Sequence, residues 1–401
     1  MNLIRGQYLD DFLNSKDYDI RKTNNARWID QKCTPDVVTI IADCILEYTS
    51  DDKNKDIFSS MDIWHNNYTV VNVEDIFKKP SPKSKAAKNE YDKFFQQPME
   101  MLSYAGILTK IKKGNRNFYS IADKGLLQEI AFGERYALFF LVKYIEKVLR
   151  DSGIYSLFEE FFDKQDKNSY EKVKFGFRDF TIEYTPINNE TEVFRIFTKV
   201  INPLAYDKSS YGTERGRLSK DIITYDMLMY NRDNFRDIYQ SKPKGITRKE
   251  HETPSPSRAR FIQYQMDKAI KNVKRVNQYY NFGLSEVEGD DNPATETHHI
   301  FPKTEFPEIS YFEENLINLT PNQHRNQAHP LGNFSVVDKE FQKICLIAKL
   351  GTIKFSIENN LGVYDFNNFL VVTDTGYRTD IFSQIELYNY EEVIRQINLL
   401  K

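Results

Sequence analysis

Four of the chain's six histidines lie within 32 residues, as the pair His298 and His299 followed by His324 and His329. A neutral imidazole can bind a divalent metal ion, and a histidine titrates close enough to neutrality to act as a general base. Adjacent histidines can therefore divide these two tasks. Hydrolysis of a phosphodiester needs a deprotonated water, a cation that offsets charge at the phosphate and a proton for the leaving oxygen. The cluster contains the residue types for that chemistry.

The segment around the cluster reads ETHHIFPKTEFPEISYFEENLINLTPNQHRNQAHP. It predicts a short strand that ends at the histidine pair, a second strand after Asn315, and a short helix that carries the last two histidines. This order and spacing resemble the ββα-metal unit of the HNH nuclease superfamily. Many HNH domains also carry a four-cysteine zinc knuckle, and this chain has no Cys-x-x-Cys sequence.

The resemblance implies a role for each of five residues. His298 matches the metal ligand at the end of the strand, and His299 matches the base that activates water. Asn315 matches the asparagine that holds the loop carrying the base. His324 matches the second metal ligand, on the helix. Glu296 fits the Glu-x-His-His form of the motif, in which the carboxylate supports the metal site.

The position of His329 is less easily read from helix geometry. Side chains of a regular helix step by about 100°, so a residue five positions after His324 points roughly 140° away from it. However, Pro330 follows His329, and the residue before a proline is pushed out of the α region. The helix is therefore expected to end here and to let the side chain swing back. We predict that His329 is a third metal ligand, the alternative being a histidine that caps the helix end or touches DNA phosphate.

The segments HHIFPK, ENLINLTPNQH and NPLAY…GRLSK…YDMLMYNR together resemble prokaryotic type II HNH restriction endonucleases. The resemblance implies cleavage of double-stranded DNA to 5′-phosphate and 3′-hydroxyl ends, with one metal ion at the phosphate. Mg²⁺ or Mn²⁺ is the expected ion, although histidine ligands would also accept Zn²⁺ or Ni²⁺. A homodimer on a palindromic site, a cognate DNA methyltransferase and a prokaryotic cytoplasm are expected with it.

Two other classes fit the same residues. One is a different nuclease, such as a modification-dependent, nicking or homing endonuclease. The other is a winged-helix DNA-binding protein in which the HNH fold is a relic without activity. Because all the motif residues are present, the relic is the weaker alternative.

The length of 401 residues predicts two or three domains. The expected fold class is α+β. We expect a winged-helix-like DNA-binding domain at 1–133, a helical or mixed connecting domain at 134–240, and the HNH nuclease domain at 241–401.

The N-terminal domain carries the clearest local pattern. A helix is expected at 34–48, behind a Thr-Pro start. Residues 91–130 predict a helix, a strand at 107–113, a tight turn, a strand at 118–122 and another helix, with Pro98 as an interruption. This is the order of a winged helix, a fold that binds DNA or protein. The wing would carry four basic residues toward DNA: Lys110, Lys112, Lys113 and Arg116.

Beyond this domain, helices are expected at 134–165, strands or short helices at 176–204, a helix at 261–280 and a helix at 335–350, followed by a mixed α+β tail from residue 353. Between 202 and 237 a flexible loop is predicted to contact DNA through Arg215 and Arg217, next to Gly212 and Gly216.

A net charge of −3 means that DNA affinity must come from local basic patches. One such patch has ten basic residues against three acidic ones: Lys242, Lys244, Arg248, Lys249, Arg258, Arg260, Lys268, Lys271, Lys274 and Arg275. Lys271, Lys274 and Arg275 are predicted to contact phosphate, the alternative being a solvated helix face. The loop at 78–88 is either a connector or a second phosphate contact.

The three cysteines, Cys33, Cys44 and Cys345, lie far apart and predict neither disulfides nor a zinc site, which favours a reducing compartment. The N-terminal sequence is too charged for a signal peptide. No stretch is long and apolar enough to span a membrane, and 136–149 reads as an amphipathic helix.

Overall fold

The computed structural model describes residues 6–50, 56–77, 79–84, 87, 91–230, 256–329, 337–359 and 361–400. This part of the chain is mostly helical, with three small antiparallel sheets of two strands each, so the predicted α+β class is confirmed at that level. The chain divides into two compact units, Gln7–Arg258 and one made mainly of Ala259–Lys401. The predicted domains 1–133 and 134–240 fall in the first unit, and their division stays a prediction.

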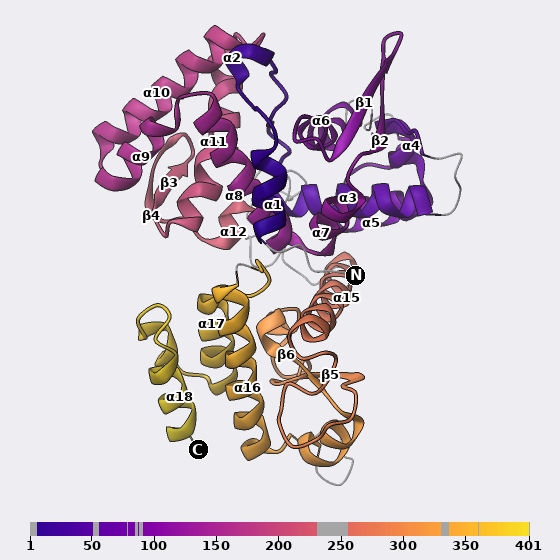
Figure 1. Cartoon of the computed structure of the whole chain (residues 1–401), viewed down its shortest axis with the longest axis vertical. Helices are drawn as coiled ribbons and strands as arrows, with labels where there is room; N and C mark the ends of the chain where they lie inside the picture. Colours follow the sequence, from indigo (N-terminus) through magenta and orange to yellow (C-terminus); the bar gives the residue numbers. More distant parts are fainter. Residues whose placement is uncertain are drawn as a thin grey trace, which may run out of the picture. The chain divides into compact units, whose positions relative to one another are not determined.

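The first unit consists of helices and two β-hairpins (Figure 1). Its helices are α1 Gly6–Asn14, α2 Ile20–Thr23, α3 Pro35–Ser50, α4 Ser60–His65, α5 Asn67–Phe77, η3 Tyr91–Phe95, α6 Gln96–Tyr104, α7 Lys124–Phe132, α8 Glu134–Asp151, α9 Tyr155–Lys164, α10 Lys167–Tyr184, α11 Glu190–Asp207 and α12 Tyr225–Leu228. The hairpins pair β1 Leu108–Lys113 with β2 Arg116–Ile121, and β3 Tyr211–Glu214 with β4 Arg217–Ile222.

Helix α3 lies at the centre of the first unit. It begins at Pro35, as the Thr-Pro start predicts, because a proline at the first helical position loses no hydrogen bond. Most of its side chains are buried, and it packs against both α7 and α8. No described helix has the length and apolar composition that a membrane span requires.

The helix, hairpin and helix predicted over 91–130 are confirmed, with a π-helical turn before α6. Pro98 lies in the first turn of α6, directly after the π-helical turn η3. The buried carboxylate of Glu100, on α6, holds the hairpin: it accepts hydrogen bonds from Tyr119 (2.6 Å), Asn117 (2.9 Å) and Lys110 (2.8 Å). Phe58 forms a further antiparallel bridge to Tyr119.

The prediction of strands or short helices at 176–204 is wrong, because α10 and α11 are two long helices. Both have side-chain caps, Asp166 before α10 and Asn189 before α11. The aromatic side chains that suggested strands, such as Phe177 and Phe180, are instead buried on one face of α10.

The flexible loop expected around Arg215 is the tight turn of a β-hairpin. Arg215 and Gly216 both have positive φ, 51° and 77°, as a two-residue turn between twisted strands requires. Lys174 donates a hydrogen bond to the Gly216 carbonyl (2.7 Å). The Asn202 amide forms hydrogen bonds with both backbone groups of Thr213 (3.0 and 2.8 Å), which fixes strand β3 close to the turn.

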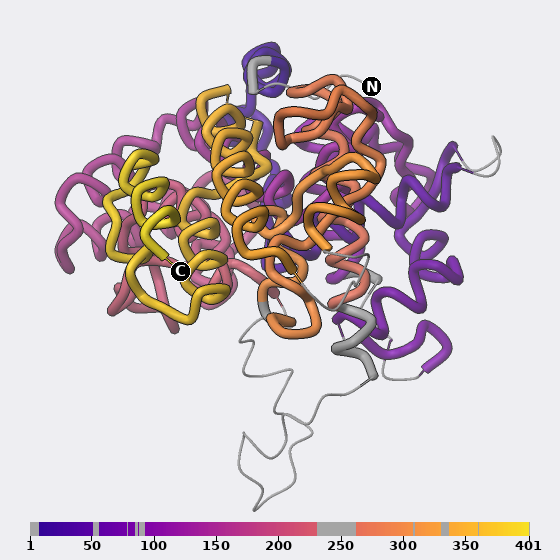
Figure 2. Tube along the Cα trace, turned by 90° about the horizontal axis from the view of Figure 1, so that it is seen from below, coloured from indigo at the N-terminus to yellow at the C-terminus, as the bar shows by residue number. Residues whose placement is uncertain are grey.

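The second unit surrounds one short hairpin with helices. Its elements are α15 Pro256–Tyr280, β5 Glu296–His299, η4 Pro307–Ile309, η5 Glu313–Asn315, β6 Leu316–Leu319, η6 Gln323–Ala328, α16 Lys339–Glu358, α17 Phe366–Tyr377, η8 Phe382–Gln384 and α18 Tyr390–Leu399. Helix α18 returns to pack against α16 (Figure 2). The expected mixed α+β tail is wrong, since the described residues after 353 are helical or irregular. Burial at a helical spacing, as at Val393 and Ile397, explains why.

A buried polar network joins α16 to strand β6. The Glu286 carboxylate accepts a hydrogen bond from the Asn318 backbone N–H (2.9 Å) and another from the Thr352 hydroxyl (2.8 Å). The Lys349 ammonium, which is fully buried, lies 2.8 Å from the same carboxylate. The charge of Glu286 is therefore compensated inside the unit, and β6 is bound to the helix behind it.

We predict that Lys349→Ala lowers the free energy of unfolding of the second unit by about 3–5 kcal/mol, because Glu286 would keep a buried charge without its partner. Urea unfolding followed by far-UV circular dichroism measures this. Tryptophan fluorescence would not, since both tryptophans, Trp28 and Trp64, lie in the first unit.

Lys354→Ala is the matched control, because that lysine is about half exposed and pairs loosely with Glu358. It should change stability by less than about 0.5 kcal/mol. The double variant Glu286→Gln, Lys349→Met should recover much of the loss. Equal stability of Lys349→Ala and the control would contradict the prediction.

Candidate metal centre

Strand β5 positions the first two histidines. It pairs with β6 in an antiparallel register that places His298 opposite Ile317 and His299 opposite Leu316. Neighbouring residues of a strand point to opposite faces of the sheet. His298 is buried at 4% exposure, and His299 is half-buried and contacts a different part of the unit. The pair is therefore divided between two environments, as the two tasks require.

The turn η6 positions the other two histidines, and its winding differs from the expected α-helix. Residues Gln323–Ala328 form a π-helix, in which hydrogen bonds join residues five apart. Residues five apart then lie over one another, as residues four apart do in an α-helix. His324 lies near the start of this turn and His329 directly follows its end. The five-residue spacing of His324 and His329, which is unfavourable in an α-helix, therefore brings their two rings to one side of the turn.

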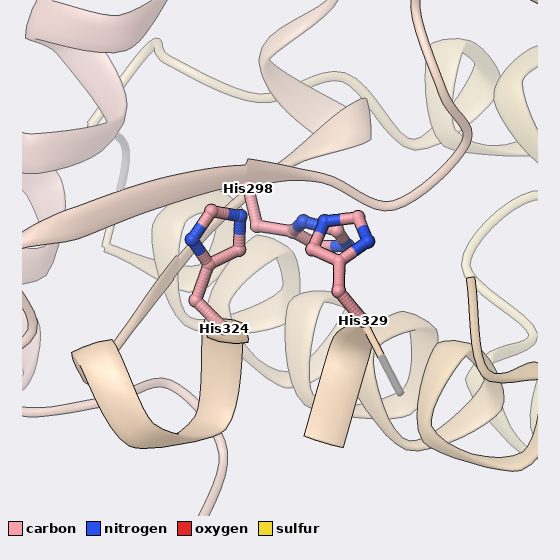
Figure 3. A group of neighbouring side chains, drawn as sticks. All are labelled: His298, His324 and His329. Carbon is pink, nitrogen blue, oxygen red and sulfur yellow. The ribbon is translucent and has the colours of Figure 1, made fainter. Parts of the chain in front are cut away.

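His298, His324 and His329 converge (Figure 3). Each offers one ring nitrogen, and the three nitrogens all lie within 4.8 Å of one another. The ring centroids are 5.0 to 5.1 Å apart. Three imidazoles in this arrangement can hold one divalent ion and leave further coordination positions for water or substrate. The donor set suits transition metals such as Zn²⁺ and Ni²⁺ better than Mg²⁺, which prefers oxygen ligands.

The charge state of the cluster also suits a metal. Burial, reinforced by the neighbouring imidazoles, lowers the pKa of His298 from 6.5 to about 3, so its ring is neutral near pH 7. His324 Nδ1 donates a hydrogen bond to the Glu296 carboxylate, and in the neutral ring the lone pair that can bind an ion is then on Nε2. Although burial raises the pKa of Glu296, its bonds with His324 and Arg325 hold that pKa below the usual value. Glu296 thus lies in the supporting position that the motif predicts.

His299 lies outside the three-histidine cluster and is oriented by the backbone. Its Nε2 lies 2.9 Å from the carbonyl oxygen of Ser310. Since a carbonyl only accepts, Nε2 carries the proton and Nδ1 keeps a lone pair. Burial lowers the pKa of His299, although the bond with Ser310 opposes the shift. A neutral ring with one fixed lone pair can take a proton from water.

Asn315 is completely buried, and among the described residues its side chain forms no hydrogen bond with a histidine. Its amide accepts from Phe301 N–H (2.8 Å) and donates to the carbonyls of Phe301 (3.0 Å) and Ile309 (3.2 Å). These bonds join Asn315, at the end of the loop between β5 and β6, to Phe301 at its start and to the residue before Ser310. Asn315 thus contacts the loop that bonds to His299, and its positioning role stays a prediction.

The predicted DNA-contacting residues differ in how accessible they are. Lys112, Lys113, Arg116, Arg215 and Arg217 are exposed on the two hairpins, and Lys271 and Lys274 are exposed on α15. The Lys110 ammonium pairs with Glu100.

Arg275 departs from the expected patch, because the nitrogen atoms of its guanidinium are buried. Its charged group is therefore not open to solvent. Of the other patch residues, Lys268 is buried. Lys242, Lys244, Arg248 and Lys249 lie outside the described residues, as do the side chains of Arg258 and Arg260 and part of the loop at 78–88.

Two residues of the site were not predicted. Ser310 orients His299 through its backbone carbonyl. Every residue type has this group, so the sequence does not reveal the contact. Arg325 forms an ion pair with Glu296 beside His324. In the sequence, only its position next to the predicted ligand His324 indicated that Arg325 belongs to the site.

Comparison with known protein families, curated proteins and solved structures finds no match to this chain. The function is therefore inferred from the residues of the site and their geometry.

We predict that His329→Ala weakens Zn²⁺ or Ni²⁺ binding at least tenfold, because one of three imidazole ligands is lost. Isothermal titration calorimetry measures the affinity, with His324→Ala as the positive reference. His65→Ala is the matched control, since His65 is exposed in the first unit and its Nδ1 bonds to the Met61 carbonyl. Metal affinity equal to that of the unaltered protein would exclude His329 as a ligand.

The low pKa of His298 predicts a pH dependence for the metal-free protein. Between about pH 6.5 and pH 3 the unfolded chain binds a proton at this residue and the folded chain does not. The free energy of unfolding therefore falls as the pH falls through this window, by at most about 1.4 kcal/mol per pH unit. His298→Asn removes this contribution. The free energy of unfolding of the variant, relative to that of the unaltered protein, should therefore rise as the pH falls. A constant difference across urea titrations in this window would contradict the assignment.

Proposed function

We propose that this protein is a metal-dependent endonuclease that hydrolyses phosphodiester bonds in double-stranded DNA. The observation that carries the proposal is that His298, His324 and His329 converge on one site, while the adjacent His299 lies outside this cluster and bonds to the Ser310 carbonyl. In this proposal the three clustered imidazoles bind the metal ion, and the imidazole of His299 takes the proton. The order of strand, strand and helical turn supports the resemblance to the HNH superfamily.

In the proposed reaction each residue has a defined task. His298, His324 and His329 hold a divalent ion, which when bound would offset negative charge at the phosphate. His299 Nδ1 takes a proton from the attacking water, because its Nε2 is committed to the Ser310 carbonyl. Glu296 fixes the tautomer of His324. Asn315 holds the loop that fixes His299.

The choice of metal can be tested within the same proposal. Mg²⁺ and Mn²⁺ are expected from the resemblance, whereas three imidazoles favour Zn²⁺ or Ni²⁺. Plasmid cleavage by metal-stripped protein, supplied with each ion in turn, distinguishes them.

The restriction-enzyme form of the proposal comes from the resemblance in HHIFPK, ENLINLTPNQH and the segment from 202 to 232. It includes a twofold dimer, a cognate methyltransferase and recognition of DNA by the winged-helix-like region. Digestion of unmethylated and methylated plasmids separates this form from a modification-dependent enzyme. A product that stops at the nicked circle would favour a nicking enzyme.

We predict that His299→Ala lowers the rate of plasmid cleavage by about 10²- to 10⁴-fold, the usual contribution of a general base. DNA affinity and metal content should stay close to those of the unaltered protein, because His299 serves the chemical step and not ground-state binding. Gel analysis of supercoiled plasmid gives the rate, and calorimetry gives the metal content. His65→Ala should cleave normally. A rate for His299→Ala above about a tenth of the unaltered rate would exclude it as the base.

A further inference from the structure

The first unit contains a polar cavity of about 590 Å³ that the metal centre does not use. Three chain segments line it: the loop with Arg27 and Lys32, the segment of η3 and α6 with Lys93 and Gln97, and the first turns of α11 with Arg195. These four cations face one carboxylate, Glu192, and the other lining side chains are polar and uncharged. Such a composition attracts anions.

Two of the cations, Arg27 and Lys32, are held in place by neighbouring side chains. Arg27 forms an ion pair with Asp30, whose side chain is fully buried, and lies 3.8 Å from Glu192. The Lys32 ammonium donates to the Tyr230 hydroxyl (2.8 Å) and lies 4.2 Å from the centre of that ring. Less conformational entropy is therefore lost when these cations meet an anion.

The other two cations are open to solvent. Lys93 and Arg195 are exposed, and no ion pair joins either of them to another residue in the described part of the chain. A ligand would thus meet two fixed and two free positive charges.

The lining also limits what kind of anion fits. A free nucleotide is usually held by an aromatic or apolar surface against its base, and among the described residues no aromatic or apolar side chain lines this cavity. Phosphate groups whose bases lie elsewhere fit better, and a nucleic acid backbone presents them in a row.

We propose that this cavity binds backbone phosphates of double-stranded DNA. The inference rests on the proposed function for its choice of polymer. It adds a phosphate-binding site in the first unit, distinct from the two hairpin tips and α15, and assigns Lys93 and Arg195 as its exposed contacts.

The test compares Lys93→Ala, Arg195→Ala with the unaltered full-length protein. Arg27 and Lys32 are left intact because each binds a neighbouring side chain. The matched control is Lys167→Ala, Lys172→Ala, which removes the same charge from exposed lysines of α10. Fluorescence anisotropy of a labelled duplex in EDTA gives affinity over a range of salt concentrations without cleavage. Titrations with ATP and with inorganic phosphate test free phosphate ligands.

We expect the double variant to bind duplex at least about tenfold more weakly, and its salt dependence to be shallower by nearly two, about 0.9 for each lost phosphate contact. The control should behave like the unaltered protein. Equal affinity and equal salt dependence of the double variant would overturn the inference, as would an unaltered protein that does not bind duplex. ATP binding that the double variant loses, with duplex binding retained, would assign the cavity to a free nucleotide and overturn the DNA assignment.

The result is independent of catalysis. If the unaltered protein binds DNA without cutting it and the double variant loses binding, the cavity assignment stands and the proposed nuclease activity fails. If the protein cuts DNA and the variant binds it normally, the nuclease stands and the cavity assignment fails.

Discussion

A two-stranded sheet with four residues in each strand is too small to keep its shape alone, so the candidate metal centre depends on polar side chains that bind its backbone. Glu286 accepts a hydrogen bond from the Asn318 N–H, and the Asn318 amide donates to the Val273 carbonyl of α15 (3.0 Å). Gln342 of α16 donates to the Ile300 carbonyl, directly after the histidine pair (2.6 Å). Helices on both sides therefore set the position of the strands, and the strands set the position of the imidazoles.

The residues of the candidate site were predictable where neighbours along the chain define them. The pair His298 and His299 and the later His324 carry their spacing in the sequence, and the structure brings His298, His324 and His329 together. The supports were not predictable in the same way. Glu286 and Gln342 are separated from the backbone groups they bind by more than thirty residues, and such contacts leave no periodic pattern.

The fold was predictable to a similar degree. Turn residues and an abrupt change of pattern identified the hairpin of β1 and β2 and the helix α3. The segments in α10 and α11 were misread because β-branched and aromatic residues favour strands on average, while packing decides each case. The sequence shows the number of basic residues in each segment but not which of their side chains are exposed, because ion pairing and burial depend on tertiary neighbours. The buried guanidinium of Arg275 and the pairing of Lys110 with Glu100 are examples.

The π-helical winding of η6 has a consequence for how such sites can vary. A π-turn holds one residue more than an α-turn, and it presents residues five apart where an α-turn presents residues four apart. An insertion of one residue between two ligands can therefore be absorbed by the backbone without moving either ligand away from the ion. His324 and His329 would then be equivalent to a pair four residues apart in an ordinary helix. A motif definition with one fixed spacing would overlook chains that solve the same geometric problem with an extra residue.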